Sequence, residues 1–145
     1  MKIFFVVLLF LYSTKLFANG TCKKCDINKV AIVNDHLDSL NYEMVLDFLC
    51  TFDSVCNTNI EYSEWSNEIL YKILEKSPTL FFKAVIDPKI DNKQILKEIE
   101  KPILDFNFQI IYDRVKATNL PFEIKTKYLN ALIIGAAYDD FKIKH

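Results

Sequence analysis

Hydrophobic side chains recur at intervals of three and four residues along most of the chain after residue 26. This spacing places the apolar positions on one face of an α-helix. The clearest case is a segment with Ser63 as a suitable N-cap and with Trp65, Ile69 and Ile73 on a continuous apolar stripe. No segment alternates apolar and polar residues for long enough to require a strand. The pattern therefore predicts an all-α fold.

Further helices are indicated by capping residues. A short first segment with a weak pattern ends near Leu40, and either Ser39 or Asn41 caps the helix that follows. Asp91 with Gln94 three residues later is a capping-box pattern for another helix. Together with the segments that begin at prolines, these signals predict five to six helices in a single compact bundle or a short stack of helical hairpins.

The four prolines mark helix boundaries, because proline suits the first turn of a helix but not its interior. Pro78 follows Ser77 and starts one helix, which ends before Pro88. Pro102 and Pro121 start two more. The last of these helices carries small residues that let a neighbour approach closely: Ala131, Gly135, Ala136 and Ala137.

Residues 1–18 have the layout of a secretory signal peptide. Lys2 precedes an apolar and aromatic run from residue 3 to residue 12, and Ala18 offers a small residue at the cleavage point. A membrane span needs about 20 apolar residues, and Lys15 interrupts this run too early. We therefore predict a leader over 1–18, one α-helical domain over 19–145, a periplasmic or secreted location, and no stable membrane span after cleavage.

The composition excludes several functional classes. A chain of 145 residues that is 51% hydrophobic, with two Gly and four Pro, is neither collagen-like nor disordered. Its 18 basic and 19 acidic side chains are nearly balanced, and Lys23-Lys24 is the one pair of adjacent bases. Nucleic acids and anionic membranes are bound by clustered cations. We therefore expect no nucleic-acid partner.

All four cysteines lie in the first third of the mature chain, and an even number in an exported protein predicts disulfides. Three pairings are open. We favour Cys22 and Cys25 each bonding one of Cys50 and Cys56, because loops of about 30 residues contribute about 3–4 kcal/mol each in the chain-entropy model. The local pairing closes shorter loops and stabilises less. A four-cysteine zinc site and a thioredoxin-like dithiol are weaker alternatives.

Recognised catalytic and cofactor-binding motifs are missing from the sequence. It has no nucleophile elbow, no phosphate-binding glycine loop and no His-Glu-x-x-His, and two histidines cannot form a multi-histidine metal centre. Asp35, His36 and Asp38 fit a solvated helix face. Asp139 and Asp140 point about 100° apart on a helix and do not converge on one substrate. We assign no catalytic residue, cofactor or metal.

The candidate partner-binding patch consists of Tyr62, Trp65, Glu61 and Glu64. The apolar stripe favours a core position for Trp65, whereas an exposed Tyr-Trp pair would be a binding hot spot with an acidic rim for a basic partner. The leader, the cysteines and the missing motifs together predict an exported, non-enzymatic helical domain that binds another protein, such as an inhibitor or immunity protein. The alternatives are a small carrier of lipid or another hydrophobic ligand and, less favoured, an acid/base hydrolase.

Overall fold

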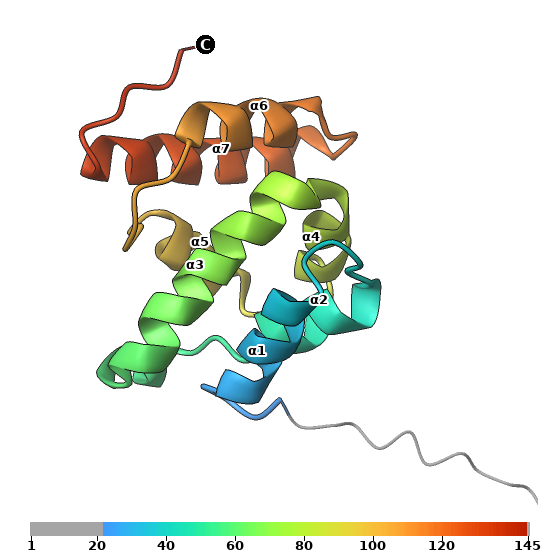
Figure 1. The fold of residues 1–145 in the computed structure, drawn as a ribbon. Coiled ribbons are helices and arrows are strands. Elements are labelled where there is room, and N and C mark those ends of the chain that lie inside the picture. The colour runs from blue at the N-terminus through green and yellow to red at the C-terminus, as the bar shows by residue number, and fades with distance from the viewer. Residues whose placement is uncertain (1–21, 145) are drawn as a thin grey trace, which may run out of the picture.

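The computed structural model describes residues 22–144, and within that range it is all-α without strands (Figure 1). The predicted fold class is confirmed, with more helices than the five to six expected. The elements are α1 (Ile27–Asp35), α2 (Tyr42–Leu49), the 3₁₀ turn η1 (Ser54–Thr58), α3 (Ile60–Lys76), α4 (Pro78–Val85), α5 (Asn92–Ile99), α6 (Phe108–Ala117) and α7 (Phe122–Tyr138). The predicted leader, residues 1–18, lies outside the described residues. No described helix has both the length and the apolar character needed to cross a membrane.

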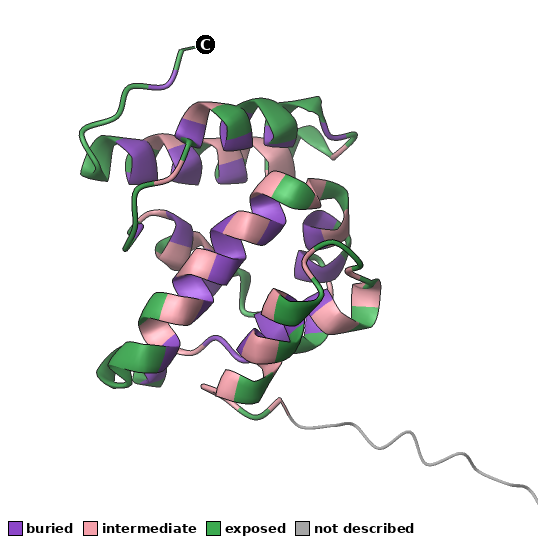
Figure 2. Cartoon of the chain, viewed as in Figure 1, coloured by how far each residue is buried: buried purple, intermediate pink, exposed green. Residues whose placement is uncertain are grey.

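Helix α3 runs through the middle of the described fold and packs against α1, α4, α5 and α6 (Figure 1). Helices α6 and α7 lie side by side on one side of it, and α1 and α2 lie on the other. Helix α2 also packs on α4, and α5 packs on α7. Along the middle of α3, buried positions alternate with intermediate ones, and exposed positions lie toward its two ends (Figure 2).

Local capping signals give several helix starts correctly. The side chain of Asn41 accepts a hydrogen bond from the backbone N–H of Met44 at 3.0 Å and starts α2. Asp91 accepts from the N–H of Gln94 at 3.1 Å and starts α5. Pro78 is the first residue of α4, as predicted. The Asn41 and Asp91 side chains each pair with a backbone N–H that the helix leaves unpaired, and proline at the first helical position has no N–H to pair.

Two predicted helix starts are wrong. Helix α3 begins four residues earlier than a helix capped by Ser63 would, because the Asn59 side chain accepts from the N–H of Tyr62 at 3.2 Å. The residues after Pro102 form a loop, and α6 begins only after Asn107, whose side chain accepts a helix-terminal N–H at 3.2 Å. Asparagine is among the strongest N-cap residues, and here it determines the start in both helices.

The predicted long-range disulfides are confirmed. Cys22 bonds Cys50 and Cys25 bonds Cys56, with Cα–Cα distances of 5.6 and 5.4 Å. They attach the segment before α1 to the end of α2 and to η1. The Lys24 ammonium donates to the Cys50 carbonyl oxygen at 2.8 Å and so holds the same segment. Disulfides persist in oxidising compartments, and these two indicate such an environment.

The small residues of α7 allow the close packing that the sequence predicts. Gly135 is buried against α5, and a Cβ atom there would lie 2.3 Å from the carbonyl oxygen of Ile99. The Tyr71 hydroxyl, from α3, donates a hydrogen bond to that same oxygen. Glycine is therefore required where α3, α5 and α7 meet.

Candidate functional site

The outward face of the N-terminal half of α3 carries a shallow hollow of about 380 Å³. Its lining consists of Glu61, Glu64, Trp65 and Glu68 from α3 and Leu104 from the loop before α6. The four helical residues share a face because residues three and four apart are neighbours on a helix. Trp65 is partly buried against the core, and Leu104 is 45% exposed. We call these five residues the Trp65 surface.

Tyr62 does not belong to this surface, although the sequence placed it in the same patch. It lies on the buried stripe with Ile69 and Ile73, is 1% exposed, and its hydroxyl is 2.6 Å from the Thr51 hydroxyl. Burial raises the pKa of Tyr62 to about 12. At 100° per residue, Trp65 lies about 60° from Tyr62 around the helix. That rotation moves Trp65 to the edge of the stripe, where it meets solvent.

The charges on the Trp65 surface are mostly unbalanced. Glu68 forms an ion pair with Lys72 at 2.6 Å, one turn further along α3. Glu61 and Glu64 are exposed and have no basic partner among the described residues. The surface therefore combines an aromatic and aliphatic floor with two carboxylates that are free to interact with a cation.

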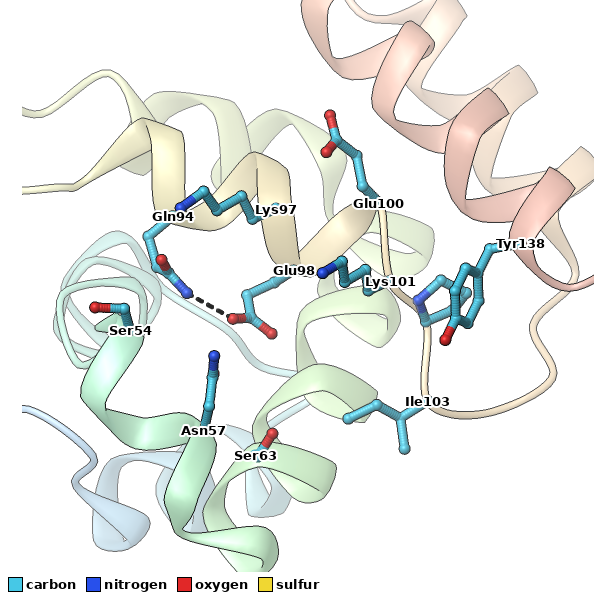
Figure 3. Close-up of a pocket in the computed structure, with 11 residues that line it drawn as sticks. Ser54, Asn57, Ser63, Gln94, Lys97, Glu98, Glu100, Lys101, Ile103 and Tyr138 are labelled. Atoms are coloured by element: carbon cyan, nitrogen blue, oxygen red, sulfur yellow. Dashed lines mark hydrogen bonds between the residues drawn. The ribbon is translucent and has the colours of Figure 1, made fainter.

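A second, more polar cleft of about 570 Å³ lies between α5, η1 and the start of α3 (Figure 3). We call it the Glu98 cleft. Glu98 points into it toward Asn57 and Ser63, and the Gln94 side chain donates to the Glu98 carboxylate at 2.7 Å. Burial raises the pKa of Glu98 above the ordinary glutamate value. The carboxylate of Glu100 points away from that of Glu98, so the two do not face a common substrate position.

Asn67 binds the loop after α5, which contributes Ile103 to the polar cleft and Leu104 to the Trp65 surface. This residue is fully buried, and its amide donates to the carbonyl oxygens of Glu98 at 3.0 Å and Lys101 at 3.4 Å. Its side-chain oxygen accepts from the N–H of Ile103 at 3.1 Å. Asn67 thus fixes the loop after α5 against α3 and places Leu104 beside Trp65. This role was not predicted from the sequence, although a polar residue within an apolar helical stripe is a usable signal.

The other polar clusters noted in the sequence lie at helix ends. The Nδ1 atom of His36 is 2.8 Å from the Ile32 carbonyl oxygen, and Asp38 accepts from Lys76. Asp139 and Asp140 lie in the turn after α7, where Asp140 has a φ of 55°. Among residues 22–144, no three His, Cys, Asp or Glu side chains are grouped so as to hold a metal ion. The Trp65 surface and the Glu98 cleft are two hollows on the described part of the chain that a partner can reach.

Comparison of the chain with protein-family models, curated proteins and solved structures finds no significant match.

Proposed function

We propose that this protein is an exported, non-enzymatic helical domain that binds another protein through the Trp65 surface. The observation that supports this most directly is the partly buried Trp65 side chain beside the unpaired carboxylates of Glu61 and Glu64. Tryptophan is enriched among residues that dominate binding energy, because its large ring gains much from losing contact with water. A rigid helix holds this ring, so little ordering is needed on binding.

The charge of the surface favours a partner that carries basic side chains around an apolar group. The apolar group would fill the hollow over Trp65 and Leu104, and Lys or Arg side chains would reach Glu61 and Glu64. Complementary charges at the rim of an interface mainly speed association and select the partner. Tryptophan also attracts a cation placed over its ring, with arginine the more common partner.

Export is the second part of the proposal. It is supported by two disulfides, which persist in an oxidising compartment, and by the leader that the sequence predicts over residues 1–18. A compact domain without recognised catalytic motifs and with an acidic recognition surface fits an inhibitor or immunity-type protein. Its partner would then be an exported enzyme or toxin with a basic surface.

The test is affinity capture from the host's exported fraction with four matched forms of the purified protein. We expect the unmodified protein to retain a specific partner, and Trp65→Ala to weaken its binding at least tenfold, as for a residue central to an interface. The Glu61→Gln, Glu64→Gln double variant should slow association and reduce its salt dependence. Phe122→Ala is the control, since Phe122 is 85% exposed and lies outside the surface.

Binding to the partner is then measured by surface plasmon resonance, with circular dichroism to show that each variant is folded. If Phe122→Ala weakens binding as much as Trp65→Ala, the interface lies elsewhere. If no partner is captured while the purified protein hydrolyses a cell-wall substrate, the proposal of a non-enzymatic binding domain is wrong.

A further inference from the structure

An apolar hollow of about 360 Å³ lies between α5, α7 and the residue that follows α4. Its apolar lining is formed by Ile86, Leu96 and Ile124 with the ring of Tyr128. Ile86 is 57% exposed, so much of its side chain is open to solvent at this hollow. The hollow shares no lining residue with the Trp65 surface or the Glu98 cleft. Its size falls within the range of small-molecule sites.

The polar groups in the walls of this hollow are already paired. The amide of Asn92 donates to the Val85 carbonyl oxygen at 2.7 Å, and its side-chain oxygen accepts from the Tyr128 hydroxyl. These atoms are therefore not available to a ligand. The other polar groups of the lining are the ammoniums of Lys93 and Lys127, and both lysines are exposed. A ligand thus meets an apolar floor and a cationic edge.

The two lysines differ in their surroundings. Lys127 forms an ion pair with Glu123 at 2.8 Å, one turn earlier in α7. Lys93 is exposed and has no acidic partner among the described residues. It is also the second residue of α5, where the helix dipole disfavours a cation. A carboxylate bound beside Lys93 would offset that unfavourable placement and pair with the free ammonium.

We propose that this hollow binds a free medium-chain fatty acid as its carboxylate. The alkyl chain lies on Ile86, Leu96 and Ile124, and the carboxylate lies beside Lys93 with Lys127 near it. A neutral lipid would leave the cationic edge unused, and a small anion would leave the apolar floor in water. The site is separate from the proposed protein-binding surface and does not depend on it. It gives the hydrophobic-ligand alternative a definite location.

The experiment is a titration followed by two-dimensional amide NMR, using the protein purified after export. Decanoate, kept below its micellar concentration, should shift amides of α5 and the first half of α7. Shortening the chain to octanoate should weaken binding by up to about fourfold for each methylene that is lost from full burial. Decanol and acetate, which lack the charge and the chain respectively, should each bind at least threefold more weakly than decanoate.

Two variants test the assigned residues. Lys93→Gln should weaken decanoate binding about threefold to fivefold, as for a partly exposed ion pair. Glutamine at this position does not carry the charge that the helix dipole disfavours, so the fold should be retained. Lys142→Gln is the matched control, because Lys142 is exposed and lies outside the hollow. Trp65→Ala should leave decanoate binding unchanged, which separates this test from that of the protein-binding proposal.

Several results would overturn the inference. Equal binding of decanol and decanoate would remove the role of the lysines. Equal losses in Lys93→Gln and Lys142→Gln would reduce the effect to overall charge. Binding to vesicles that contain anionic phospholipid, without binding of free decanoate, would assign the face to a membrane surface instead.

Discussion

Replacing Gly135 by alanine tests the close packing between α5 and α7. An added Cβ atom would lie 2.3 Å from the Ile99 carbonyl oxygen and 3.0 Å from the Tyr71 hydroxyl. The first of these atoms belongs to the backbone, so it cannot rotate away as a flexible side chain can. Helix α5 must therefore move relative to α7, and the hydrogen bond from Tyr71 to Ile99 must lengthen or break.

The expected effect is the balance of two opposing contributions. Alanine is better than glycine inside a helix by about 1 kcal/mol. Overpacking a filled core costs about 1–3 kcal/mol, and leaving the buried Tyr71 hydroxyl without its acceptor costs about 1–3 kcal/mol more. The packing terms exceed the helix gain. We therefore expect Gly135→Ala to lower the free energy of unfolding by about 1–5 kcal/mol, with a central value of about 3 kcal/mol.

The measurement is urea unfolding followed by circular dichroism, with both disulfides intact. Ala137→Gly is the control, because Ala137 is exposed on the same helix, and it should cost about 0.5–1 kcal/mol through helix propensity alone. Tyr71→Phe removes the hydroxyl near the new methyl group. The double variant Tyr71→Phe, Gly135→Ala should then be less unstable than the sum of the two single effects by at least 0.5 kcal/mol.

A stabilising Gly135→Ala would refute this reasoning. A gain of about 1 kcal/mol is what an unobstructed helix position gives, and it would mean that α5 and α7 are further apart than the structure places them. Strict additivity with Tyr71→Phe would show that the Tyr71 hydroxyl takes no part in the obstruction.

Three further predictions concern the loop, the disulfides and the cleft. Asn67→Ala should destabilise the protein by about 3 kcal/mol and speed hydrogen exchange at the loop after α5, because three backbone partners lose their bonds; unchanged exchange there would contradict this. Cys25→Ser with Cys56→Ser should cost about 3–4 kcal/mol in urea unfolding, as expected for opening a loop with a sequence separation of 31. The raised pKa of Glu98 means that the folded state binds this proton more tightly than the unfolded state, so stability falls as the pH rises above the ordinary value of 4.5. Glu98→Gln should therefore stabilise the protein at pH 7 and flatten that fall, and an unchanged pH profile would show that Glu98 is not desolvated.

The sequence by itself determined the features that depend on near neighbours along the chain. Apolar spacing of three and four residues indicated helices, and Asn41, Asp91 and Pro78 marked three of their starts, because a cap satisfies donors only within its own first turn. Long-range disulfides were also favoured, since longer loops constrain the unfolded chain more, but which of Cys50 and Cys56 bonds Cys22 is given only by the structure. The protein-binding function stays a prediction.

Tertiary structure decided which side of each helix meets solvent. Tyr62 and Trp65 lie three residues apart on one helix. Tyr62 is buried against Thr51 and Phe52, whereas Trp65 is partly buried and lines an open hollow with Leu104. The Glu98 cleft and the Asn67 bonds join residues more than 30 positions apart in the chain. Periodicity shows which residues share a face, but burial depends on the helix or loop that packs against that face. This is why the helical spacing was predicted correctly, whereas the places of Tyr62 within the buried stripe and of Trp65 at its edge were not.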